Sequence, residues 1–375
     1  MRQLISGVIT ILFAVLLGTA GHAFAAPEAA RPGDLVSFTK LPDGWGGTGN
    51  GYEITYRTEA ADGGLTTANG LVFLPSGPAP ESGWPIVSWD HGTNGLGPTC
   101  GLTSSAGAPY DSPLLLRLNQ AGYAAVATDY LGLSKVSTRT HPYHHIRTEA
   151  TASIDIVRAA RHAVPELSKN WAAFGASQGG SAALATGNLA SSYAPELDFR
   201  GTAALAPGSQ LDQLVPLAGP GVPNLGPING SVSVVVAILA GMEANLLDFD
   251  IHPYLTARGE QVLHDISTRC VTEWDGVLGD ASLGSLMARS LDTPEFRRIA
   301  HDYLAIPTTG YQQPIFIGHG IRDISAPYPL TLALLAQFTA AGTAYEFQTF
   351  DTDHAGITVG GGFDAGLDFL RRVFQ

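Results

Sequence analysis

The pattern with the clearest chemical potential in this sequence is a serine between two glycines, Gly175-Ala-Ser177-Gln-Gly179. An apolar run at 171–174 precedes it, and a run of small residues follows from Gly180. A strand, a G-x-S-x-G turn and a helix in this order form a nucleophile elbow, in which the serine hydroxyl projects from the top of a sheet. The pattern is a hypothesis that needs context, the alternative being an ordinary turn serine.

The context comes from an acid and a histidine further along the chain. A serine hydroxyl is a weak nucleophile at neutral pH, so it needs a base within reach and a third group that orients the base. Asp323 follows an apolar, strand-like run and His354 follows the next one, which is the serine–acid–histidine order of α/β-hydrolases. We predict that Asp323 orients His354, and that His354 takes the proton of Ser177.

Alternative acids lie close to the histidine, since Asp351 and Asp353 are within three residues of it. Asp323 could then be a surface turn residue, and His354 could be a helix cap. We favour Asp323 because the carboxyl ends of neighbouring parallel strands meet at one edge of a sheet, where such folds carry their sites.

Acyl transfer also needs an oxyanion hole of two N–H groups, each contributing about 3 to 4 kcal/mol. One donor is predicted to be the backbone amide of Gln178, the residue after the nucleophile. The other should lie in the loop after the strand at 85–89, where we favour the Thr93 amide over that of Gly92. His91 in this loop is predicted to be structural rather than catalytic.

Three clustered histidines, His141, His144 and His145, raise the question of a metal site. Their spacing matches no standard site and no cysteine or carboxylate stands beside them, so we predict no metal and no other cofactor. Tyr130, at the end of a strand, could line an acyl pocket or simply be packed in the core.

The elements that would position these residues alternate between strand-like runs and segments with helical spacing. The runs at 52–57 and 66–73 predict an antiparallel pair, and the later ones a mostly parallel central sheet with helices on both faces. This is an α/β class chain with the α/β-hydrolase fold. Residues 26–207 and 309–375 would form its core, and 208–308 an inserted helical cap, or else a second layer of packing.

The N-terminal residues resemble an export signal. A positive start, an apolar stretch at 5–17 and Ala23-Phe-Ala25 predict a secretory signal peptide at 1–25, the alternative being an uncleaved anchor. No later run is long enough to span a membrane, so we expect a secreted or periplasmic protein with no stable membrane insertion.

The net charge of the chain limits the classes of partner that it is expected to bind. The net charge of −13 argues against a nucleic acid or an anionic membrane as partner.

In an exported protein the two cysteines, Cys100 and Cys270, suggest one disulfide, which would stabilise the chain by roughly 4 to 5 kcal/mol. Two free buried thiols are the alternative. The sequence does not specify an oligomeric state.

Taken together, these segments resemble the secretory lipase family of Candida antarctica lipase A-like α/β-hydrolases, in its bacterial form. The resemblance covers roughly 36–375, and the Ser191-Ser-Tyr-Ala-Pro-Glu-Leu197 segment is its most specific part. It rests on the following segments: 174–180, 191–197, 128–133, 141–143, 318–327 and the loop of His354.

The resemblance implies a helical cap, action on carboxylic esters, Ser177, Asp323 and His354 as the triad, and pairing of Cys100 with Cys270. The yeast lipase has a longer C-terminal flap and a second disulfide, and neither has a counterpart here. Long-chain lipid preference and interfacial activation are therefore not implied.

We thus predict an exported serine hydrolase that cleaves small-molecule or lipid esters through an acyl-serine intermediate. The alternative is a peptidase or amidase with the same triad, because both reactions pass through the same kind of tetrahedral intermediate. A non-catalytic binding protein on a hydrolase scaffold would require the loss of a triad position, and the sequence keeps all three.

Overall fold

The computed structural model describes residues 29–47, 49–104, 108–223 and 230–375. The predicted signal peptide, 1–25, lies outside these residues. Residues 31–375 form one compact unit. Within the described part of the chain, no helix has the length and apolar character that crossing a membrane requires.

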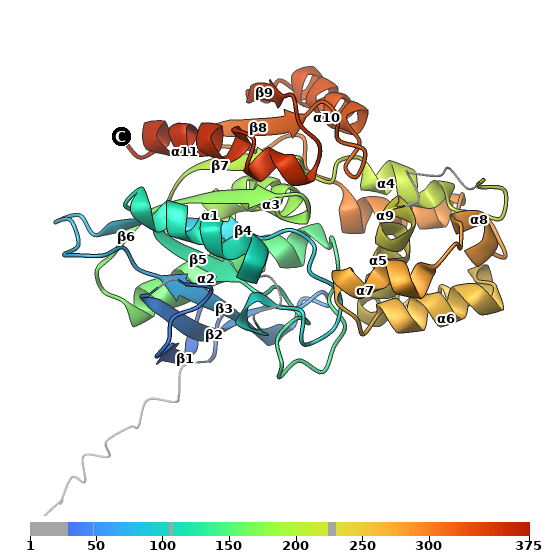
Figure 1. The fold of residues 1–375 in the computed structure, drawn as a ribbon, viewed down its shortest axis with the longest axis horizontal. Helices are drawn as coiled ribbons and strands as arrows, with labels where there is room; N and C mark the ends of the chain where they lie inside the picture. The colour runs from blue at the N-terminus through green and yellow to red at the C-terminus, as the bar shows by residue number, and fades with distance from the viewer. Residues whose placement is uncertain (1–28, 48, 105–107, 224–229) are drawn as a thin grey trace, which may run out of the picture. The chain divides into compact units, whose positions relative to one another are not determined.

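The described strands build one sheet of nine, in the order β1-β2-β3-β5-β4-β6-β7-β8-β9 (Figure 1). The pairs β1–β2, β2–β3 and β3–β5 are antiparallel. Strands β4 to β9 run parallel to one another, which confirms the predicted, mostly parallel sheet. The first strand, β1, had not been predicted. The strands are β1 Leu35–Lys40, β2 Gly51–Glu59, β3 Leu65–Phe73, β4 Trp84–Asp90, β5 Ala124–Thr128, β6 Leu167–Ala176, β7 Asp198–Leu205, β8 Ile315–Gly320 and β9 Glu346–Phe350.

Helices cover both faces of the sheet. Successive side chains of β6 point to opposite faces, so Trp171 and Ala173 pack in the cluster with α2 and α3, while Ala172 and Phe174 pack with α1 and α11. The core helices are α1 Ala108–Gln120, α2 Ile146–Ala163, α3 Gln178–Tyr193, α10 Tyr328–Ala341 and α11 Gly362–Val373.

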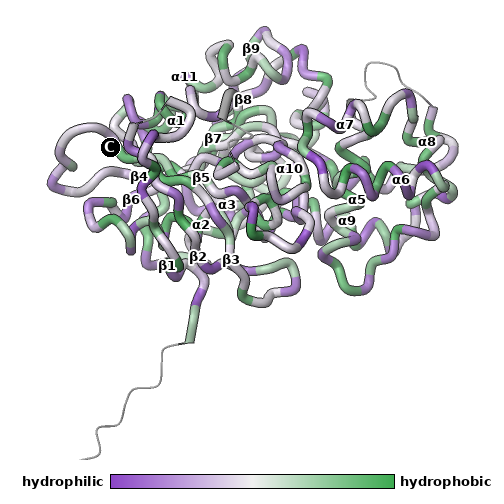
Figure 2. Tube along the Cα trace, turned by 60° about the horizontal axis from the view of Figure 1, so that its bottom comes forward, coloured by the Kyte–Doolittle hydropathy of each residue, from purple (hydrophilic) through white to green (hydrophobic). Residues whose placement is uncertain are grey.

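Between β7, which ends at Leu205, and β8, which begins at Ile315, the chain leaves the sheet and forms a set of helices, here called the insertion (right in Figure 1). Apolar and polar stretches are interleaved along part of the insertion (Figure 2), whereas helix α5, Gly230–Asn245, is apolar over most of its length. The short helix α8, Leu283–Leu286, ends where Met287 pairs with Leu255. The helices are α4 Leu211–Leu214, α5 Gly230–Asn245, α6 Ala257–Ile266, α7 Val271–Leu278, α8 Leu283–Leu286 and α9 Pro294–Leu304.

The insertion has its own hydrophobic cluster, which also takes in Leu96 and Tyr143 from loops of the core. These two residues are buried, so the insertion and the loops near the carboxyl ends of β4 and β5 share one packed interior. Its members within the insertion include Val236, Val262, Trp274, Phe296 and Tyr303.

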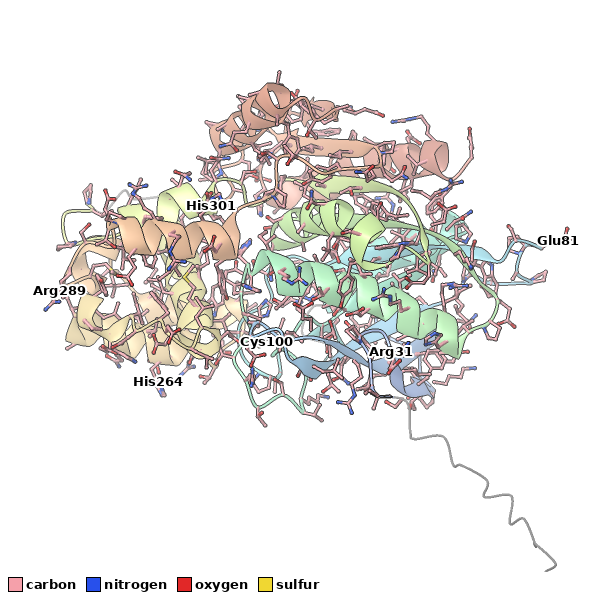
Figure 3. The ribbon with its side chains drawn as sticks, turned by 180° about the vertical axis from the view of Figure 1, so that it is seen from behind. Arg31, Glu81, Cys100, His264, Arg289 and His301 are labelled. Atoms are coloured by element: carbon pink, nitrogen blue, oxygen red, sulfur yellow. A yellow bond between two sulfur atoms is a disulfide. The ribbon has the colours of Figure 1, made fainter. Side chains whose placement is uncertain are left out.

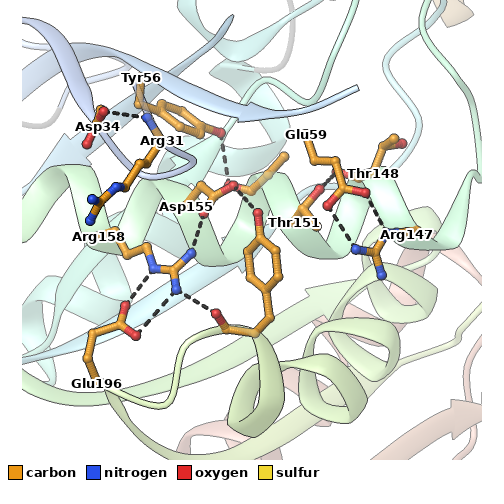
Figure 4. A network of polar contacts seen from close by, with 12 residues as sticks. Arg31, Asp34, Tyr56, Glu59, Arg147, Thr148, Thr151, Asp155, Arg158 and Glu196 are labelled. Atoms are coloured by element: carbon orange, nitrogen blue, oxygen red, sulfur yellow. Dashed lines mark hydrogen bonds and ion pairs between the residues drawn. The ribbon is translucent and has the colours of Figure 1, made fainter. Parts of the chain in front are cut away.

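One arginine ties α2 to the end of α3 (Figure 4). Arg158 donates to the Glu196 carboxylate at 2.6 Å, to the buried Asp155 at 2.9 Å and to the Tyr193 carbonyl at 2.6 Å. A guanidinium can hold several acceptors at once because its N–H groups form a rigid fork. Tyr193 and Glu196 belong to the 191–197 segment on which the family resemblance rests, so that segment has a structural role in holding the two helices together.

A disulfide joins the loop after β4 to the insertion. Cys100 bonds Cys270, the residue before α7, as the sequence analysis expected; Figure 3 labels Cys100 beside the insertion. Backbone bonds reinforce the connection: Leu96 N–H donates to the Arg269 carbonyl at 3.1 Å and Val271 N–H to the Asn94 carbonyl at 2.9 Å. The insertion is thereby fixed to the loop that continues from His91.

Removal of this disulfide should destabilise the fold. The bond closes a loop of 170 residues, and chain-entropy models give about 5 kcal/mol for a loop of this size. We therefore expect a Cys100→Ser/Cys270→Ser double variant to unfold at markedly lower urea concentration than the oxidised wild type. Reduced wild type should match the double variant; equal midpoints for the oxidised and reduced protein would contradict the expectation.

Candidate active site

Ser177 lies in the sharp turn between β6 and α3. Its backbone is held at φ 60° and ψ −122°, a conformation that L-residues rarely adopt. A side chain on Gly175 would meet the carbonyl of Gly179, and one on Gly179 would meet the carbonyl of Asp90. The two glycines therefore let the strand, the turn and β4 approach closely, and the serine side chain projects from the turn.

His354 connects the serine to the acid. Its Nε2 lies 2.8 Å from the Ser177 hydroxyl oxygen, and its Nδ1 lies 2.6 Å from Asp323 Oδ2. An ionised carboxylate only accepts, so Nδ1–H donates to Asp323 and Nε2 is left to accept the serine proton. The side chain of Asp323 is fully buried, while that of His354 is 26% exposed, so the serine–histidine pair faces solvent.

Asp323 is held in its loop as an anion. Its Oδ1 accepts from the N–H groups of Ser325 and Ala326, each at 2.9 Å. Burial raises the pKa of this carboxyl, but hydrogen bonds from His319 and His354 outweigh the burial and hold the pKa below its usual range. The group is therefore ionised at any working pH and can stabilise a positive charge on His354.

His319, a buried residue of β8 four positions before Asp323, was not predicted as a residue of the site. Its Nε2 lies 2.9 Å from the Ala326 carbonyl and 3.3 Å from Asp323 Oδ2. One N–H of His319 thus contacts both Asp323 and Ala326, the two ends of the acid loop, 323–326. The spacing His319–Asp323 was visible in the sequence, but a histidine inside a strand carries no local signal that it turns toward a loop.

The two alternative acids lie elsewhere. The exposed Asp351 pairs with Arg322 at 3.4 Å, and Asp353 accepts from the Gly356 N–H at 2.8 Å. Of the acids considered, the structure places only Asp323 within hydrogen-bond distance of His354.

The loop after β4 passes beside the serine. A side chain built on Gly92 would lie 3.7 Å from Ser177 Cβ, which puts this backbone next to Ser177. Thr93 Oγ1 is 2.6 Å from the Tyr143 hydroxyl, and Tyr130 OH donates to the His91 carbonyl at 3.3 Å. Tyr130 is thus a buried support of this loop. Within the described part of the chain, neither the Thr93 nor the Gln178 amide N–H donates a hydrogen bond to a backbone carbonyl.

The three clustered histidines are buried, and two of them contact the elbow region through a polar network. His141 Nδ1 lies 2.7 Å from the Leu131 carbonyl and its Nε2 lies 2.8 Å from Gln178 Nε2, so both ring nitrogens are engaged. His144 N–H donates to Glu149 at 3.0 Å. His145 caps α2.

Within the described part of the chain, three possible metal ligands converge only in the insertion, at Glu243, Asp250 and His252. There His252 is already paired, with Nδ1 2.8 Å from Glu260 and Nε2 3.4 Å from Glu243. These exposed ion pairs account for the cluster without an ion.

Buried acids should make the stability of the fold depend on pH. Burial raises the pKa of Glu149 to about 8 and that of Asp111 to about 7, from ordinary values of 4.5 and 3.8. Above those ordinary values the folded chain binds more protons than the unfolded chain, so the free energy of unfolding falls as pH rises. Four histidines with pKa values lowered by burial oppose this trend only below their ordinary pKa of 6.5: His91, His141, His144 and His145.

We therefore expect the melting temperature to fall between about pH 6.5 and about pH 8. Calorimetry across this interval tests the sign. A Glu149→Gln variant cannot ionise at this position and should show a smaller fall. A melting temperature that rises through the same interval would refute the expectation.

Comparison with known proteins identifies a family that matches most of this chain. A model of the secretory lipase family matches residues 102–362. Among solved structures, the chain is similar to the rice cell wall degrading esterase LipA from Xanthomonas oryzae, with a TM-score of 0.75 and 21% identity, over 91% of this chain and 99% of that one. It is also similar to Candida antarctica lipase A, with a TM-score of 0.71 and 21% identity, over 89% and 83% of the two chains. A search of curated proteins finds no match.

Proposed function

The chain belongs to the secretory lipase family and is a carboxylic ester hydrolase; from this premise we propose that it acts as an exported serine hydrolase with Ser177, His354 and Asp323 as its triad. The observation that carries the assignment is the continuous hydrogen-bond chain Ser177–His354–Asp323, at 2.8 and 2.6 Å. An α/β-hydrolase uses this arrangement for acyl transfer.

The proposed reaction has two halves. His354 Nε2 accepts the hydroxyl proton as Ser177 Oγ attacks the ester carbonyl carbon, and the resulting imidazolium is stabilised by the ionised Asp323. The imidazolium then protonates the leaving alcohol, and the acyl group remains on Ser177. Water, deprotonated by His354, attacks this acyl-enzyme; the bond between the acyl carbon and Ser177 Oγ then breaks, His354 returns the proton to Ser177 Oγ, and the carboxylic acid is released.

The negative oxygen of each tetrahedral intermediate needs N–H donors. We assign this role to the backbone amides of Gln178 and Thr93, with Gly92 as the second choice for the latter. The support is that the Gln178 amide opens α3 directly after the nucleophile, where the helix dipole favours negative charge, and that the 91–94 loop lies beside Ser177. We further propose that the helical insertion, 208–308, caps the site and shapes the pocket for the ester.

We also propose that the protein is exported from the cytoplasm. Membership in a secretory family, a disulfide and the apolar stretch at 5–17 support a signal peptide at 1–25, cut after Ala25, and a location in the periplasm or the medium. N-terminal sequencing of the protein recovered from outside the cytoplasm tests the cleavage position.

Ester and amide substrates that share one acyl group test the reaction class. We expect the purified protein to hydrolyse p-nitrophenyl esters and to leave the matched p-nitroanilides almost intact. A fluorophosphonate probe should modify the peptide that contains Ser177. Faster hydrolysis of the anilide would favour the amidase alternative, and no reaction with the probe would exclude a serine hydrolase.

A further inference from the structure

The proposed reaction uses the backbone N–H of Gln178 and assigns no role to its side chain. The residue is 1% exposed, and its Nε2 lies 2.7 Å from Glu149 Oε1 and 2.8 Å from His141 Nε2. The two amide protons therefore have two different acceptors. Glu149 comes from the first turn of α2 and His141 from the loop after β5, so the side chain links the start of α3 to two other elements.

Each acceptor is itself fixed. His141 Nδ1–H donates to the Leu131 carbonyl at 2.7 Å, which leaves Nε2 as the acceptor for Gln178. Burial lowers the pKa of His141 to about 3, so the ring stays neutral and keeps this acceptor. Glu149 Oε1 also accepts from the His144 N–H at 3.0 Å. The orientation of the Gln178 amide is thereby determined by its neighbours.

Helix α3 lacks the usual means of fixing its first turn. A serine at the N-cap normally accepts a backbone N–H of the helix with its hydroxyl. Here Ser177 is the N-cap, but it makes no side-chain cap bond and its hydroxyl lies at His354 instead. The helix therefore begins at the residue that carries the expected oxyanion donor, without a side-chain cap to hold that donor in place.

We propose that Glu149 and His141 are positioning residues for acyl transfer: by holding the Gln178 side chain, they fix the direction in which the Gln178 backbone N–H points into the oxyanion hole. The inference rests on the proposed function and adds to it two residues and a mechanism of alignment. Donors to an oxyanion act only over a narrow range of distance and angle, so a side chain that locks the residue raises the rate of the chemical step.

The effect should appear in kcat and not in KM. The tetrahedral intermediate depends on the aligned N–H more than the bound ester does, and an interaction made in the transition state alone lowers kcat when it is lost. We expect Gln178→Met, which keeps the length of the side chain but removes its amide, to lower kcat by about 10- to 100-fold with KM changed less than about twofold.

Glu149 offers a matched pair of variants. Its Oε1 accepts both hydrogen bonds and its Oε2 has no described partner. Since burial raises the pKa of Glu149 to about 8, the acid is protonated at pH 7 and closely resembles glutamine. Glu149→Gln should therefore keep near-wild-type kcat at pH 7, whereas Glu149→Leu should lower kcat as far as Gln178→Met does. The double variant Gln178→Met/Glu149→Leu should be no worse than either single one, because both break the same link.

The control is Asp155→Asn, another buried acid of α2. Its partners are Arg158 and Tyr193, away from the elbow, so it should lower the melting temperature without changing kcat. Affinity for an alkyl boronic acid, which forms a tetrahedral adduct on the serine, should weaken in step with kcat in the Gln178 and Glu149 variants.

The outcomes separate the two proposals. If wild type hydrolyses no ester, the proposed function fails. If wild type is active but Gln178→Met and Glu149→Leu retain kcat and boronic acid affinity within about twofold, the positioning inference is wrong. If one of these variants does not fold, the other one and Glu149→Gln still decide it.

Discussion

Ser177→Ala is expected to lower p-nitrophenyl ester hydrolysis by about 10⁴-fold or more while the melting temperature stays close to that of wild type. The substitution removes only the hydroxyl group, whose oxygen would form the acyl-enzyme. The variant can still stabilise the direct attack of water on the ester. The turn itself should persist, because it depends on Gly175 and Gly179 and on the Ser177 N–H bond to the Leu205 carbonyl, at 2.9 Å.

The matched control is Ser181→Ala, one helical turn further along α3. Ser181 is buried and donates to the Gly208 carbonyl at 3.2 Å. It has no described contact with His354, so this variant should hydrolyse the ester at nearly the wild-type rate. Initial rates at saturating ester, with active sites counted by fluorophosphonate labelling of wild type, provide the comparison. Wild-type-like turnover by Ser177→Ala would overturn the assignment of the nucleophile.

Asp323→Asn should reduce kcat by about 10⁴-fold at neutral pH. The asparagine amide could donate to His354 Nδ1, which would leave the proton on Nε2 and deny Ser177 its base. The variant also loses the negative charge that stabilises the imidazolium. The loop should stay folded, since an amide oxygen can still accept from Ser325 and Ala326.

Asp351→Asn is the control for this second variant. Asp351 is close to His354 in the sequence but is exposed and paired with Arg322, so its loss should change kcat less than about twofold. Steady-state rates from about pH 5 to about pH 9 compare the two proteins. An inactive Asp351→Asn together with an active Asp323→Asn would reverse the assignment of the acid.

The local features of the active-site residues were predictable because they depend on neighbours in sequence. An apolar run followed by Gly-x-Ser-x-Gly and small residues predicts a strand, a tight turn and a helix from backbone sterics alone. The alternation of strand-like and helical segments predicted the mostly parallel sheet in the same way. Helices α1 and α7 went unpredicted, and α1 carries an internal proline, Pro113, that is atypical of a helix.

The sequence alone predicted the order of the elements, the candidate nucleophile and base, and three candidate acids. The folded chain was needed to show that Asp323 is the aspartate that faces His354, that His319 braces the acid loop, that the Ser191–Leu197 segment binds Arg158, and that Gln178 is anchored by Glu149 and His141. Periodicity and turn chemistry act over a few residues, whereas most of these contacts join side chains 29 to 38 positions apart through the packing of separate strands and helices. His319 and Asp323 are only four positions apart, but they meet because the loop after β8 folds back on the strand. No local pattern encodes such a contact, because it exists only when the sheet brings its loops to one edge.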